Sequence, residues 1–87
     1  GMTVDAEGGV WIAVWGGARI CRYTPDGQLD RSIAMPASQI TSCAFGGRNL
    51  DRLYVTSAAE GVDEPYAGAL FEIDAGTVGL PAHQFAG

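Results

Sequence analysis

The chain has 87 residues, which is enough for one small domain or for part of a larger one. Five arginines and no lysine stand against ten acidic residues, and the formal net charge of −5 argues against nucleic acid or an anionic membrane as a partner. The uninterrupted apolar stretches are only a few residues long, too short to cross a bilayer, and we expect a cytoplasmic protein.

Strand-like runs alternate with turn signals from the start of the chain, and helical periodicity never lasts more than about a turn. The first four runs cover 2–5, 10–15, 18–24 and 28–35. Turns rich in glycine or proline separate them, with Gly16-Gly17 suited to a tight hairpin and Pro25 to Gly27 forming the next turn. Four short antiparallel strands in this space predict one blade of a β-propeller.

The pattern then restarts. Its second copy covers 40–45, 52–58 and 68–74, with 80–87 as a candidate outer strand. Tyr54 corresponds to Trp11, and a longer loop, 59–67, accounts for the larger spacing before the third strand. A repeat of about 40–50 residues with four strands per unit is typical of propellers. The sequence therefore predicts an all-β propeller fragment with one blade at about 1–36 and another at about 39–87.

Two blades cannot close a ring, since propellers usually contain four to eight. Each end would expose an apolar blade face, and 47% of the residues are hydrophobic. We therefore expect the chain to pack against missing propeller blades or against other copies of itself.

Residues within both copies of the repeat also resemble a known family. They are 1–13, 17–23, Pro36, the T-S-C-x-F-G-G motif at 41–47, 53–58, 68–73 and 85–87. In this order they are similar to the C-terminal third of the SMP-30/gluconolactonase/regucalcin family. The resemblance implies a six-bladed propeller with a divalent cation, calcium or zinc, in its central channel. It also implies hydrolysis of sugar lactones or related esters, in which a metal activates water and a carboxylate moves the proton.

The family's functional residues cannot be placed on this chain. The resemblance implies metal ligands that are a Glu, Asn residues and an Asp from different blades, and that Asp directly precedes the Gly-Met matched by Gly1 and Met2. Asp5 instead matches a turn Asp, whose carboxylate is expected to cap the turn at 6–8. We therefore assign no catalytic or metal-binding residue and expect no cation bound by this chain alone. Gly1 is either the natural residue or a remnant of tag removal, and in the second case translation would begin at Met2.

Thr41 and Ser42 are the candidate substrate-binding residues. They begin the second inner strand, at the position equivalent to the missing Asp, where they could line the channel. The alternative is that their hydroxyls only satisfy backbone groups at a strand start.

Other chemically active side chains are given structural roles. Cys21 and Cys43 have no metal-ligand spacing and are expected to be buried free thiols, with a disulfide as the alternative. His83 is expected to be a tail residue without a catalytic partner. The acidic loop with Glu60, Asp63 and Glu64 fits no cation-binding motif and is expected to be solvated. Three aromatic residues are expected to pack in blade cores: Trp11, Tyr54 and Phe71.

Three functions remain open. The first is a C-terminal fragment of a metal-dependent sugar-lactone hydrolase that is inactive alone. The second is a stand-alone module that self-assembles, for example three copies giving six blades. The third is a non-enzymatic binding propeller, which would require the T-S-C-x-F-G-G match to be accidental.

Overall fold

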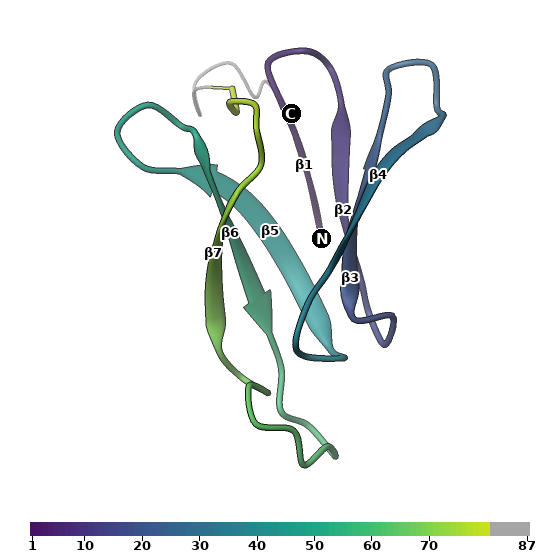
Figure 1. Cartoon of the computed structure of the whole chain (residues 1–87), viewed down its shortest axis with the longest axis vertical. Helices are drawn as coiled ribbons and strands as arrows, with labels where there is room; N and C mark the ends of the chain where they lie inside the picture. Colours follow the sequence, from purple (N-terminus) through teal and green to yellow (C-terminus); the bar gives the residue numbers. More distant parts are fainter. Residues whose placement is uncertain (81–87) are drawn as a thin grey trace.

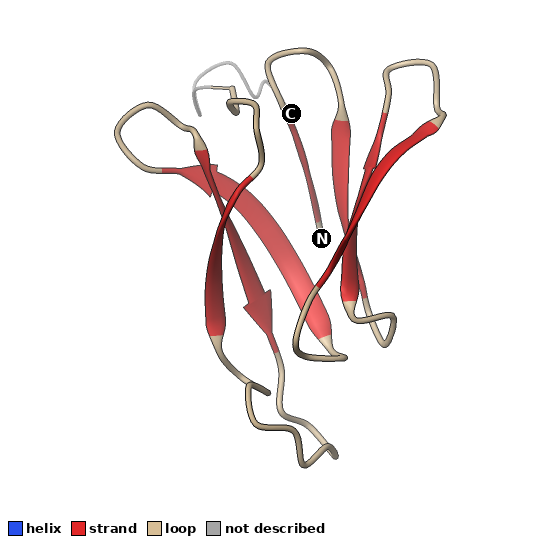
Figure 2. Ribbon diagram, in the orientation of Figure 1, coloured by secondary structure: helices blue, strands red, loops and turns tan. Residues whose placement is uncertain are grey.

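The computed structural model describes residues 1–80, which form two antiparallel sheets (Figure 1). The first sheet has the order β1-β2-β3-β4 and the second has the order β5-β6-β7. The strands are β1 (Met2–Val4), β2 (Val10–Val14), β3 (Arg19–Tyr23), β4 (Leu29–Ala34), β5 (Ile40–Gly46), β6 (Arg52–Ser57) and β7 (Leu70–Asp74). All regular elements of the described part are strands, as Figure 2 shows, and the predicted all-β class is confirmed. Over residues 1–80 there is accordingly no helix that could cross a membrane.

Local turn chemistry sets the hairpins of the first sheet. Gly16 has φ +76° in the β2–β3 turn, and Gly27 has φ +88° in the β3–β4 turn. Both values lie in the left-handed region that glycine enters without steric cost. The turns predicted from Gly16-Gly17 and from Pro25 to Gly27 therefore form where the sequence places them.

The second sheet has three strands within the described residues. The outer strand expected over 80–87 lies, apart from Leu80, outside the described residues. The β1–β2 turn contacts the segment just before this region, because the Ala6 amide donates to the Val78 carbonyl at 2.8 Å.

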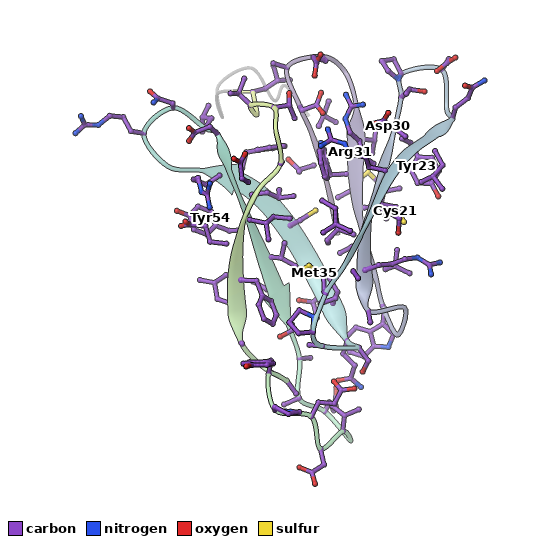
Figure 3. All side chains as sticks on the ribbon, viewed as in Figure 1. Cys21, Tyr23, Asp30, Arg31, Met35 and Tyr54 are labelled. Atoms are coloured by element: carbon purple, nitrogen blue, oxygen red, sulfur yellow. The ribbon has the colours of Figure 1, made fainter. Side chains whose placement is uncertain are left out.

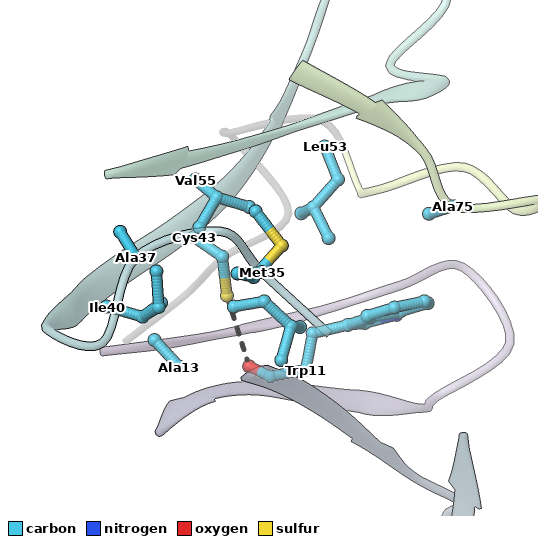
Figure 4. Close-up of a cluster of buried hydrophobic side chains, with 10 residues drawn as sticks. Trp11, Ala13, Met35, Ala37, Ile40, Cys43, Leu53, Val55 and Ala75 are labelled. Atoms are coloured by element: carbon cyan, nitrogen blue, oxygen red, sulfur yellow. Dashed lines mark hydrogen bonds between the residues drawn. The ribbon is translucent and has the colours of Figure 1, made fainter. Parts of the chain in front are cut away.

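The hydrophobic core lies between the two sheets (Figure 4). Trp11 of the first sheet and Leu53 and Val55 of the second are fully buried. Phe71 packs against this core from β7. The remaining core side chains include Ala13, Ile20, Met35, Ala37, Ile40, Cys43 and Ala75. Along β2 and β6 the core residues alternate with residues of the opposite face, as the two-residue period of a β-strand requires.

Tyr54 does not share this core, contrary to the prediction. It lies between Leu53 and Val55 in β6, so the pleat turns its side chain to the opposite face, where its strand neighbours are Ala44 and Glu72. Figure 3 shows the ring on the side of the second sheet away from the first. Tyr54 occupies the same repeat position as Trp11, but the described residues place no further sheet against it.

Each sheet therefore has an outer face that points away from the other sheet. The outer face of the first sheet is largely apolar, with Arg19 and Ser32 as its polar members; the others are Met2, Val4, Val10, Ile12, Val14, Cys21, Tyr23, Leu29 and Ala34. The outer face of the second sheet is more polar and consists of Ser42, Ala44, Arg52, Tyr54, Thr56, Leu70, Glu72 and Asp74.

Candidate functional site

Asp5 is the fully buried carboxylate of the first sheet, at the turn between β1 and β2. Its Oδ1 accepts the amide protons of Glu7 and Gly9, each at 2.9 Å. Its Oδ2 accepts the indole Nε1–H of Trp11 and the Nε–H of Arg22, each at 2.8 Å. The predicted turn-capping hydrogen bond is confirmed, and the two side-chain partners are additional.

These partners keep Asp5 ionised. Burial of the carboxylate would raise its pKa, but the hydrogen bonds from Arg22, Trp11 and the two turn amides together hold the pKa of Asp5 below its ordinary value of 3.8. The hydrogen bond to Asp5 in turn raises the pKa of Arg22, and the guanidinium also pairs with Asp30 at 3.1 Å. Asp5 is therefore a charge-compensated structural group and not a free base.

A second arginine connects this network to the core. The guanidinium carbon of Arg31 lies 5.0 Å from the centroid of the Trp11 ring, a cation–π geometry. Its Nη1 donates to the carbonyl of Ala75, which follows β7 in the second sheet. Figure 3 shows Arg31 and Asp30 next to each other on β4. Arg31 thus links the first sheet to the end of β7 in the second.

The strands β1 and β5 lie side by side, and Gly1, which precedes β1, contacts the beginning of β5. The backbone nitrogen of Gly1 donates to the Thr41 carbonyl at 2.9 Å. A β-carbon added to Gly1 would clash with the Ser42 side chain, so Ser42 closely covers the chain at this point. The repeat predicts that Thr41 and Ser42 occupy a position equivalent to the residue before Gly1, and the structure places them in direct contact with Gly1.

Thr41 sits at an irregularity in the ladder. The β5–β6 register shifts between Ile40 and Ser42, so that Ile40 lies opposite Ser57 while Ser42 lies opposite Thr56. The Thr41 hydroxyl lies 2.7 Å from the Thr56 hydroxyl. Thr41 is half-buried, while Ser42 and Thr56 are exposed. Their role in substrate binding stays a prediction at this point.

The acidic loop is anchored to the segment before β5. The Glu64 carboxylate accepts the Ser38 amide at 3.0 Å, and this hydrogen bond lowers the pKa of Glu64. The side-chain amide of Gln39 donates to the Glu60 carbonyl at 2.7 Å and accepts the Glu60 amide at 3.1 Å. Glu60 and Asp63 are exposed, as expected of a solvated loop, while the half-buried Glu64 is held by the backbone. Across residues 1–80 no three His, Cys, Asp or Glu side chains gather in a metal-binding arrangement.

The remaining candidates are structural or undescribed. Cys21 and Cys43 are buried free thiols, as predicted. Cys43 donates to the Trp11 carbonyl at 3.5 Å, the hydrogen bond drawn in Figure 4, and burial raises its pKa to about 11. His83 lies outside the described residues.

Comparison with known proteins places this geometry in context. A model of the SMP-30/Gluconolactonase/LRE-like region matches residues 1–59. The whole chain is 39% identical to a regucalcin of Gallus gallus and 42% identical to the putative sugar lactone lactonase YvrE of Bacillus subtilis. In both cases the chain spans 32% of the relative's length.

Solved structures agree with this match. A luciferin-regenerating enzyme superposes with a TM-score of 0.82 and 37% identity, over 92% of this chain and 29% of that one. A regucalcin from Agrobacterium tumefaciens, described as a calcium-binding protein, superposes with a TM-score of 0.80 and 39% identity, over 84% of this chain and 27% of that one.

Proposed function

Because this chain belongs to the SMP-30/gluconolactonase/LRE-like family, we propose that it supplies two propeller blades to a metal-dependent sugar-lactone hydrolase and is inactive alone. The similarity to a putative sugar lactone lactonase supports the reaction class. The similarity to a regucalcin described as calcium-binding supports a divalent cation as cofactor. Bound in a channel, such a cation would polarise the lactone carbonyl and lower the pKa of water.

The observation that carries this proposal is the environment of Asp5. A hard cation binds carboxylate oxygens that have lone pairs to spare. Each oxygen of Asp5 already accepts two hydrogen bonds at 2.8–2.9 Å, and Arg22 compensates its charge. Of the other nearby carboxylates, Asp30 is paired with Arg22 and Arg31, and Glu7 lies 3.8 Å from Arg22.

Residues 1–80 therefore do not fit the implied cation. The metal ligands and the proton-transfer group of the reaction must come from blades that another part of a longer protein, or another chain, provides. No step through the metal is assigned to the residues described here.

Within this proposal the chain contributes to substrate binding. Thr41 and Ser42 lie at the start of β5, beside Gly1 at the start of β1. The innermost strand of each blade lines the channel of a propeller. We assign the hydroxyls of Thr41 and Ser42 to contacts with the substrate in that channel.

The test is a chimera. This chain replaces the matching third of the Bacillus subtilis relative, and hydrolysis of D-glucono-1,5-lactone is followed with added Ca²⁺, Zn²⁺ or Mn²⁺ and with a chelator. We expect metal-dependent turnover within about tenfold of the parent, since most of the chimera is the parent. A folded, metal-loaded chimera without turnover would contradict the proposal.

The alternative, a module that assembles with its own copies, is favoured by one specific observation. The outer face of the first sheet is largely apolar, and its Met2 side chain is 66% exposed. Packing this face against the outer face of the second sheet of another copy is a heterologous contact, which closes a ring when three copies complete six blades.

Sedimentation velocity of the purified chain tests this alternative. A trimer that dissociates on Met2→Glu, but not on the control Val78→Glu, is the expected result. Val78 is also exposed but follows β7 and belongs to neither outer face. A monomer at all concentrations would contradict it.

A further inference from the structure

Gly1 is held on two sides by backbone hydrogen bonds. Its nitrogen donates to the Thr41 carbonyl at the start of β5 at 2.9 Å, and its carbonyl accepts the Ala13 amide of β2 at 3.0 Å. Figure 1 accordingly shows the N-terminus between β5 and β2. A movement of Gly1 away from either strand would therefore lengthen one of these two hydrogen bonds.

Ser42 leaves room at this point only for a residue without a side chain. A β-carbon on Gly1 would lie 3.0 Å from the Cβ of Ser42 and 3.2 Å from its Cα, and it would overlap the Oγ. Ordinary contacts between carbon atoms are about 3.5–4.0 Å. Rotation of the Ser42 hydroxyl does not remove the clash, because the backbone of β5 fixes the Cα and Cβ atoms. The close approach of β5 therefore requires glycine at position 1.

This junction lies where it can affect a reaction in the channel. The strands β1 and β5 each begin their sheet, and in a propeller the innermost strands line the channel. The repeat makes the position before Gly1 equivalent to Thr41 and Ser42, so a residue placed there enters the channel wall beside them. Its location follows from that of Gly1, to which a planar peptide bond joins it.

We propose that Ser42 is a positioning residue that packs on the bare backbone of Gly1 and thereby fixes the channel-lining position before Gly1. This role needs the Cα and Cβ of Ser42, whereas the substrate contact assigned above needs its hydroxyl. Misplacement of a group by about 1 Å can lower a rate about a hundredfold. That a reaction takes place in this channel rests on the proposed function, and the packing of Ser42 on Gly1 does not.

The experiment uses the chimera, in which Gly1 directly follows a residue of the Bacillus subtilis relative. Gly1→Ala should lower kcat for D-glucono-1,5-lactone about 10- to 100-fold and leave KM within about threefold. Adding Ser42→Gly removes the two atoms that meet the new methyl group most closely, and should restore kcat to within about threefold of the parent chimera. Adding Ser42→Ala removes only Oγ and should restore kcat in part. Both double variants are judged on kcat, because loss of the Ser42 hydroxyl should itself raise KM.

Gly46→Ala is the matched control. Its new β-carbon would meet the Tyr54 ring at 2.7 Å, but at the other end of β5. We expect it to lower the thermal unfolding midpoint and to leave kcat within about twofold. Hydrogen exchange of the Ala13 amide gives a readout that needs no turnover. This exchange should be faster in Gly1→Ala and slow again in Gly1→Ala/Ser42→Gly.

The proposal is overturned if Gly1→Ala keeps the kcat of the parent chimera, if neither Ser42 variant restores it, or if Gly46→Ala loses as much. Unchanged exchange of the Ala13 amide in Gly1→Ala would overturn it whether or not the chimera hydrolyses lactone. A parent chimera without turnover would contradict the proposed function, and the Ala13 amide then tests the packing of Ser42 on Gly1 by itself.

Discussion

The Nε atom of Arg22 lies 2.8 Å from Oδ2 of Asp5, and the Asp5 side chain is completely buried. This ion pair joins the β1–β2 turn to β3 across 17 residues of sequence. Trp11 completes it from β2 with its indole N–H. The Asp5 carboxylate is thus held by the β1–β2 turn, by β2 and by β3, all of its own sheet.

Replacing Asp5 by Asn should strongly destabilise the chain. The buried Arg22 would lose its main counter-charge, and breaking a buried pair in this way costs about 3–5 kcal/mol. Asp30→Asn is the matched comparison, because the Asp30 side chain is 38% exposed and an exposed pair contributes about 0–1 kcal/mol. Urea unfolding gives both values, and equal losses for the two variants would contradict the structural role of Asp5.

A second substitution should repair part of that loss. In Asp5→Asn/Arg22→Met the unpaired charge is gone, and replacing both members of a buried ion pair by uncharged groups is often nearly neutral. We expect the double variant to be more stable than Asp5→Asn. A double variant less stable than the single one would show that Arg22 contributes mainly through other contacts.

The stability of the chain should fall at acidic pH partly through Asp5. Its pKa is lowered in the folded state, so the unfolded chain takes up its proton first as the pH falls. The contribution of the ionised carboxylate is complete above the unfolded pKa of about 3.9 and is lost as the pH drops through the lower folded pKa. Between pH 6 and pH 3, urea midpoints of the parent should decrease more than those of Asp5→Asn/Arg22→Met. Equal decreases would contradict the assignment.

Cys43 should be chemically inert in the folded chain. Burial raises its pKa to about 11, against an ordinary value of 9.0. At pH 8 the thiolate fraction is therefore reduced by about two orders of magnitude, before any effect of limited access. Thiol labelling of Cys21→Ser, which leaves Cys43 as the sole cysteine, should be slow in buffer and fast in urea. Rapid labelling of the folded protein would contradict the buried position.

The sequence predicts those features of the fold that local chemistry determines. Glycine and proline turns placed the hairpins of the first sheet, and the family resemblance implied the turn role of Asp5. The ion pair was not predicted, because Arg22 reaches Asp5 only once β2 and β3 pair in a register that puts Trp11 opposite Arg22. A single charged residue within the apolar run 20–23 was the available signal.

Two other features could not be predicted from the repeat: the side of the sheet that Tyr54 faces and the contact between Thr41 and Thr56. The repeat matched Tyr54 to Trp11, but the side chain of Tyr54 faces away from the first sheet, so Leu53 and Val55 form the core instead. Thr56 was missed because its meeting with Thr41 depends on the register shift in β5. The spacing of Ile40 and Cys43, two apolar residues three apart in a strand, was the clue.

The rate of D-glucono-1,5-lactone hydrolysis by the purified 87-residue chain with saturating Ca²⁺, Zn²⁺ or Mn²⁺ shows whether the chain is inactive alone. Since Asp5 is occupied by Arg22 and Trp11, we expect a rate equal to that of buffer with the same metal. Metal-dependent turnover by the chain, abolished by a chelator, would contradict it.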